Sequence, residues 1–149
     1  MKNLYSEEIM DHFRNPRNMG VINDADAEAT IGNPHCGDVM KMYIKVAKRP
    51  LSQKLKVKSK KLDKQTENEE YIKDIKFQTL GCGAAIASSS IATELVKGKS
   101  LTEALKLTSD EIARRMGKLP PVKYHCSILA EEGIKKVIEN YENRRDKNQ

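Results

Sequence analysis

The stretch DIKFQTLGCGAAIASSSIATELVKG, residues 74–98, places a strand, a cysteine-bearing turn and a helix in direct succession. Residues 74–80 begin with the polar and apolar alternation of a half-buried strand. Small residues follow from Ala84, and Gly98 supplies a C-cap, so we expect a helix over residues 84–97 that packs closely on a sheet. Cys82 stands at the junction between these two elements, flanked by Gly81 and Gly83.

The segments on either side extend this pattern into a helix, then strands, then helices. The first expected helix is capped by Ser6 and runs to about Arg14. Two strands are expected over residues 25–31 and 40–46. Two short helices begin at capping boxes that open with Ser100 and Thr108, and a last helix runs from His125 or Cys126 to about Arg144. This order predicts an α+β fold. We expect a small antiparallel three-stranded sheet with helices packed on one face and the cysteines on loops at one end.

The positive charge of the chain is concentrated in one segment. The 149 residues carry a formal net charge of +6, and the lysine-rich stretch from Lys48 to Lys64 supplies all of this excess. Because the rest is close to neutral, the distribution argues against nucleic-acid binding. We expect one domain, residues 1–149, with a lysine-rich insertion at about 48–68 that forms a protruding hairpin or loop. Docking of a partner with an acidic surface is the alternative for this insertion.

The sequence also indicates the compartment. No apolar run approaches the roughly 18 residues that a membrane-spanning helix needs. The first residues, MKNLYSEEIM, carry glutamates where a secretory signal would need an apolar stretch. We therefore expect a cytoplasmic protein with no membrane association. Three cysteines cannot all pair with one another, and in a reducing compartment they are available as ligands or nucleophiles.

Each cysteine lies where one predicted element gives way to another. With Asp38, two residues after Cys36, and His125, beside Cys126, they give five candidate ligands for a site that needs four. Thiolates suit iron–sulfur clusters or zinc. Two other interpretations concern Cys126 alone. It could be a core residue, or a nucleophile with His125 as its base, although adjacent side chains often diverge and the other thiols would then have no role.

The sequence resembles IscU-type iron–sulfur cluster assembly scaffolds and the N-terminal domain of NifU proteins. The resemblance rests on YSEEIMDHFRNPRNMG (5–20), GNPHCGDVMKM (32–42), TLGCGAAIASSSIATELVKGKSLTEA (79–104) and LPPVKYHCSILAEEGIKKVI (119–138). It implies that Cys36, Cys82 and Cys126 hold a nascent [2Fe–2S] cluster. It also implies that Asp38 or His125 completes the site, or helps to hold zinc when no cluster is present.

The resemblance further implies a set of partners for a scaffold that is not an enzyme. A cysteine desulfurase would supply sulfur as a persulfide, with Cys126 as the first choice of acceptor. An Hsp70-type chaperone with its J-domain co-chaperone would bind Leu119, Pro120, Pro121, Val122 and Lys123. Apo-proteins would receive the cluster. The sequence does not fix the oligomeric state, and a homodimer is one candidate.

The sequence departs from such scaffolds mainly between Val46 and Tyr71, where a lysine-rich stretch replaces a short turn. Tyr124 also stands where an aliphatic residue is common. A SufU-like sulfur acceptor is one alternative, because that family shares the Asn-Pro-x-Cys-Gly-Asp loop. Those proteins carry their insertion later and lack the His-Cys pair. A zinc-binding structural or regulatory protein of the same fold is the other alternative.

Overall fold

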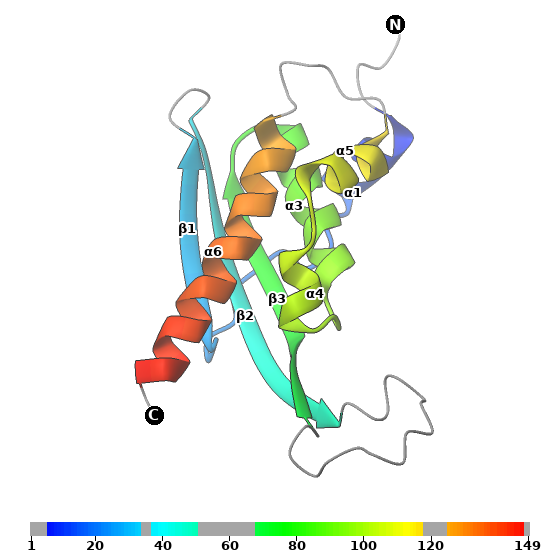
Figure 1. Cartoon of the computed structure of the whole chain (residues 1–149). Coiled ribbons are helices and arrows are strands. Elements are labelled where there is room, and N and C mark those ends of the chain that lie inside the picture. Colours follow the sequence, from blue (N-terminus) through cyan, green and yellow to red (C-terminus); the bar gives the residue numbers. More distant parts are fainter. Residues whose placement is uncertain (1–5, 34–36, 51–67, 118–124, 148–149) are drawn as a thin grey trace, which may run out of the picture.

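The computed structural model describes residues 6–33, 37–50, 68–117 and 125–147 (Figure 1). Its elements are α1 (Glu7–Arg14), β1 (Ala27–Asn33), β2 (Asp38–Pro50), β3 (Asn68–Leu80), α3 (Gly83–Val96), α4 (Leu101–Leu105), α5 (Ser109–Met116) and α6 (His125–Lys147). The strands form an antiparallel sheet in the order β1-β2-β3, and α3 and α6 pack against it. The predicted α+β fold is confirmed.

The sheet buries one row of apolar side chains against the helices. Met40, Met42 and Ile44 alternate along β2 and are fully buried. Met42 lies opposite Phe77 of β3, and Ile44 lies opposite Ile75. Such alternation keeps one face of each strand in the core.

β2 and β3 are longer than the sequence indicates. Their pairing continues past a bulge at Lys45 and Val46 and ends where Pro50 lies opposite Asn68. Arg49 and Glu69 form an ion pair with Nε and Oε2 2.6 Å apart near this end. The long two-stranded ribbon therefore extends to the base of the lysine-rich segment, whose residues 51–67 lie outside the described part of the chain.

The helices begin at the caps that the sequence predicts. The side chain of Ser6 accepts a hydrogen bond from the backbone N–H of Ile9, and Ser100 forms a reciprocal capping box with Glu103. Thr108 accepts from the backbone N–H of Glu111. These caps satisfy amides that have no partner inside a helix. None of the helices among the described residues is both long enough and apolar enough to cross a membrane.

α3 is the central helix, and its small residues allow neighbours to approach closely. It is buried at Ala84, Ala85, Ala87, Ser88, Ser89, Ser90, Ile91, Ala92, Thr93 and Val96. α6 buries the predicted residues Ala130, Ile134, Val137 and Ile138, with Tyr141 partly buried beside them. Ser90 also anchors the N-terminal region, because its hydroxyl contacts His12 Nδ1 at 2.7 Å and accepts from the backbone N–H of Arg17 at 2.8 Å.

Candidate metal centre

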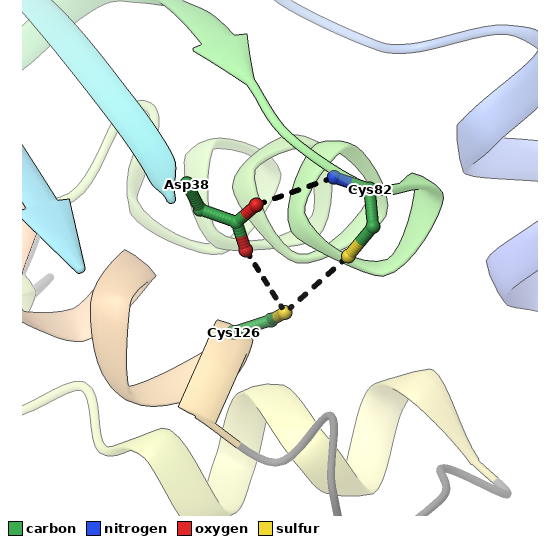
Figure 2. A group of neighbouring side chains, drawn as sticks. All are labelled: Asp38, Cys82 and Cys126. Atoms are coloured by element: carbon green, nitrogen blue, oxygen red, sulfur yellow. Dashed lines mark hydrogen bonds between the residues drawn. The ribbon is translucent and has the colours of Figure 1, made fainter. Parts of the chain in front are cut away.

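Three elements bring potential ligands to one end of the sheet. Asp38 is the first residue of β2, Cys82 is the N-cap of α3, and Cys126 is the second residue of α6. Figure 2 shows these side chains pointing toward one another. One ligand atom from each lies within 4.8 Å of the other two. We call Asp38, Cys82 and Cys126 the ligand group; it is assembled by the fold from residues far apart in the sequence.

The distances within the ligand group suit a shared ion. Cys82 Sγ lies 3.8 Å from Cys126 Sγ, and Cys126 Sγ lies 3.8 Å from Asp38 Oδ2. The other carboxylate oxygen, Asp38 Oδ1, accepts a hydrogen bond from the backbone N–H of Cys82 at 3.4 Å (Figure 2). Asp38 therefore faces one cysteine with each of its oxygens.

The ligand group lies just below the surface. Cys126 is 0% exposed and Asp38 is 3% exposed, whereas Cys82 is partly exposed. Cys82 therefore forms the open side of the site. It also lies at the N-terminus of α3, where the helix dipole favours negative charge.

Phe13 of α1 closes one side of the turn that carries Cys82. A Cβ added at Gly83 would lie 3.1 Å from Cδ1 of the Phe13 ring, which is closer than most real contacts of this kind. The absence of a side chain at Gly83 thus lets α1 approach the first turn of α3. Phe13 itself remains 43% exposed beside the site.

A buried hydroxyl joins the two helices that carry the cysteines. Ser88 Oγ lies 3.1 Å from the carbonyl oxygen of Cys126 and 3.0 Å from that of Ala85, and both are acceptors for its proton. This link fixes the first turn of α6 against α3. The sequence predicts only close packing for the small residues of this helix, and the link from Ser88 to Cys126 is not predicted. The hydroxyl of Ser88, a polar group in the middle of the helix, is the feature of the sequence that indicates a buried hydrogen bond.

The structure brings together three of the five predicted ligands. Cys36 lies outside the described residues. The backbone of His125 begins α6 as predicted, but its side chain lies outside the described part of the structure. The predicted chaperone-binding residues 119–123 also lie outside it. The ligand roles of all five residues, and the acceptor role of Cys126, therefore stay predictions.

The donor set indicates which metals fit the site. Two thiolates and one carboxylate combine soft sulfur with a harder oxygen ligand, a combination that suits iron or zinc. Hard ions such as magnesium and calcium prefer sites made of oxygen alone. The ligand group leaves a coordination position for at least one further ligand, because such ions usually take four.

Comparisons with known proteins identify the family of the chain. The family model described as the NifU-like N terminal domain matches residues 4–60 and 54–148. The chain is 47% identical over 138 residues to iron-sulfur cluster assembly scaffold protein IscU 1 of Archaeoglobus fulgidus, covering 93% of this chain and 76% of the relative. It is 45% identical over 145 residues to IscU of Escherichia coli, covering 95% and 97%. It is 44% identical over 147 residues to the mitochondrial iron sulfur cluster assembly protein 1 of Debaryomyces hansenii, covering 97% and 71%.

Solved structures share the fold at lower sequence identity. A NifU-like N-terminal protein from Brucella abortus superposes with a TM-score of 0.66 at 19% identity, covering 94% of this chain and 95% of the other. A putative iron-sulfur cluster assembly scaffold protein for the SUF system from Fervidobacterium islandicum gives a TM-score of 0.65 at 22% identity, covering 91% and 96%. From the family match and the identity over nearly the whole chain, this protein belongs to the NifU-like N-terminal domain family, among the IscU-type iron–sulfur cluster assembly scaffolds.

Proposed function

We propose that this chain assembles a [2Fe–2S] cluster on Cys36, Cys82, Cys126 and one harder ligand, Asp38 or His125, and then passes the cluster to apo-proteins. The observation that carries the proposal is the ligand group itself, with its three ligand atoms within 4.8 Å of one another. The cluster is cargo in this scheme, so the site has to bind it and later release it.

The ligand chemistry supports release. A carboxylate or an imidazole holds iron less tenaciously than a fourth thiolate would. Asp38 lies at the very start of β2, and Cys82 lies in the turn between β3 and α3. These ligands therefore lie at the end of the sheet, and the core row of β2 and β3 can stay packed while the site releases its cargo.

The sulfur acceptor in this proposal is Cys126. Its thiolate attacks the outer sulfur of a desulfurase persulfide, the sulfur–sulfur bond of that persulfide breaks, and the desulfurase cysteine leaves as a thiolate. Cys126 then carries the persulfide. Because Cys126 is 0% exposed, this step requires the ligand group to open first. Because Cys82 is the partly exposed member of the ligand group, its side of the site is the natural place to open.

The partners of the chain follow from the same proposal. A cysteine desulfurase supplies sulfur, an Hsp70-type chaperone with a J-domain co-chaperone assists release at residues 119–123, and recipient apo-proteins take the cluster. Self-association into a homodimer and a cytoplasmic location also stay predictions. One relative is named as mitochondrial, so the compartment differs within the family.

Zinc binding is the second candidate, because the ligand group also fits a tetrahedral zinc ion. In this candidate the metal stays bound and has a structural or regulatory role. A chelator then distinguishes the two functions, since a structural zinc ion resists removal under conditions in which a scaffold releases its cargo.

Anaerobic reconstitution tests the proposed function directly. The metal-free chain is incubated with ferrous iron, cysteine, a cysteine desulfurase and a thiol reductant that converts persulfide sulfur to sulfide. Visible absorption and Mössbauer spectra are recorded before an apo-ferredoxin is added. We expect [2Fe–2S] spectra that move to the ferredoxin. Cys82→Ser should lose the spectra, whereas Ser89→Ala, a change in the same helix outside the ligand group, should keep them. A metal-free chain that forms no cluster under these conditions, yet binds zinc when zinc is supplied, would overturn the proposal.

A further inference from the structure

Gly81 has no room for a side chain because Asp38 occupies the space beside it. The Cβ added by Gly81→Ala would lie 2.2 Å from Asp38 Oδ1 and 2.7 Å from Asp38 Cγ. Both distances are far shorter than any non-bonded contact of a real Cβ. The carboxylate of the ligand group therefore sits directly over the α carbon of Gly81.

The backbone itself does not require glycine at this position. The described glycines with positive φ are Gly20, Gly37, Gly98 and Gly117, and Gly81 is not among them. The φ of Gly81 therefore lies outside the left-handed region that favours glycine over alanine. The close approach of Asp38 is thus the feature of the structure that excludes a larger residue.

We propose that Gly81 is a positioning residue that keeps the carboxylate of Asp38 available as a ligand. The space above Gly81 lets Oδ1 reach the backbone N–H of Cys82 at 3.4 Å. This contact directs Oδ2 toward Cys126 Sγ, 3.8 Å away. The inference deepens the proposed function: position 81 decides whether the two thiolates act with a hard oxygen ligand beside them or without one.

A substitution at Gly81 should therefore remove the carboxylate and leave the sulfur atoms in place. The two impossible contacts are with Oδ1 and Cγ of Asp38, which both move when the side chain rotates; Asp38 Cβ, 3.2 Å away, is a tight contact that a shift of a few tenths of an ångström relieves. Rotation of one side chain costs less than displacement of the strand or helix that carries it. Gly81→Ala should accordingly behave like Asp38→Ala, although it changes no ligand.

A double-mutant cycle on zinc affinity tests this equivalence. The affinity of the metal-free chain for Zn²⁺ is measured by competition with a chromogenic chelator for the parent, Gly81→Ala, Asp38→Ala and the double variant. We expect each single change to weaken binding by a similar factor of about 10 to 100. The double variant should bind no more weakly than Asp38→Ala. A double variant whose loss of zinc affinity equals the product of the two single losses would show independent effects and would overturn the inference.

Gly32→Ala is the matched control. Gly32 lies next to the site in β1, and a Cβ there would meet the backbone oxygen of Asp38 at an ordinary 3.8 Å. Its zinc affinity should equal that of the parent. An equal loss of affinity in Gly32→Ala and Gly81→Ala would show a general effect of added side chains, and would contradict a specific role for Gly81.

A crystal structure of metal-free Gly81→Ala gives a readout that needs no metal. Asp38 should be rotated away, with Cys82 and Cys126 in their present positions. A carboxylate still in place, or a displaced turn at Cys82, would contradict the inference. These tests use no iron, sulfide or desulfurase, so failed cluster assembly would refute the proposed function alone. Equal zinc affinity of the parent and Asp38→Ala would refute this inference alone.

Discussion

The sulfur atoms of Cys82 and Cys126 lie 3.8 Å apart, although 44 positions separate the two cysteines in the chain. One belongs to the turn before α3 and the other to the first turn of α6. A single metal ion, or one edge of a cluster, can reach both without rearrangement of either helix. The fold therefore prearranges two thiols, with Asp38 beside them, and the following predictions test what this arrangement does.

Asp38→Cys should slow the release of the cluster. The variant replaces the carboxylate of the ligand group with a further thiol beside Cys82 and Cys126. A thiolate holds iron more tightly than a carboxylate oxygen does. We expect assembly to proceed and transfer to an apo-ferredoxin to slow by about 10- to 100-fold, the range over which changes around a metal site shift its affinity. Stopped-flow absorption measures the transfer. An unchanged transfer rate would argue against Asp38 as the labile ligand.

Cys126→Ser should abolish persulfide formation. A hydroxyl cannot replace the thiolate that attacks the desulfurase persulfide. Mass spectrometry of the chain after incubation with a desulfurase and cysteine, without iron, should show the added sulfur only when Cys126 is present. Cys82→Ser serves as the comparison and should keep the adduct. An adduct on Cys82 in the Cys126→Ser variant would assign the acceptor role to the more exposed thiol.

Replacement of residues 51–67 by the dipeptide Asn-Gly should leave assembly intact. Pro50 lies opposite Asn68 at the end of the β2–β3 ribbon, so a two-residue hairpin turn can join the strands there. We expect a melting temperature within a few degrees of the parent and an equal rate of cluster formation. Loss of desulfurase binding, measured by calorimetry, would instead assign partner docking to the lysine-rich insertion.

His12 should make the fold less stable in mild acid. It is 3% exposed, and burial together with the nearby Arg17 lowers its pKa below the ordinary 6.5, although Glu94 and Glu8 oppose this shift. Because the folded state then binds a proton less readily than the unfolded state, stability is complete above about pH 6.5 and falls as the pH drops below it.

Urea unfolding between pH 7.5 and about pH 5.5 measures this dependence, over the range in which a histidine titrates. His12→Gln should flatten the slope, because glutamine does not titrate. The variant also loses the hydrogen bond between His12 and Ser90, which lowers its stability at every pH. The relevant readout is therefore the slope of the unfolding free energy against pH, and not its absolute value. Equal slopes in the parent and the variant would contradict the role of His12.

The sequence predicts most of the fold because its signals are local. The caps at Ser6, Ser100 and Thr108, the alternation in β2 and the small residues of α3 all act within a few positions of one another. The ends of β2 and β3 are less predictable. Their extension to Pro50 and Asn68 depends on pairing between the strands, which supports segments that have no clear alternation of their own.

The site is predictable in its residues but not in its geometry. Flanking glycines and positions at the ends of predicted elements are local signals, and they indicate Cys82 and Cys126 as ligands. The separation of the two sulfur atoms, the full burial of Cys126 and the contact between Gly81 and Asp38 depend on how β2, α3 and α6 pack together. No local pattern at position 81 reveals that Asp38, from β2, fills the space where a side chain of residue 81 would lie.

Native mass spectrometry of the anaerobically reconstituted chain tests the central claim most directly. If residues from separate segments hold one cluster, the parent should gain the mass of one [2Fe–2S] unit per chain. That gain should disappear in both Cys82→Ser and Cys126→Ser. A parent chain that gains no cluster mass, or a cluster that survives in either single variant, would contradict the account.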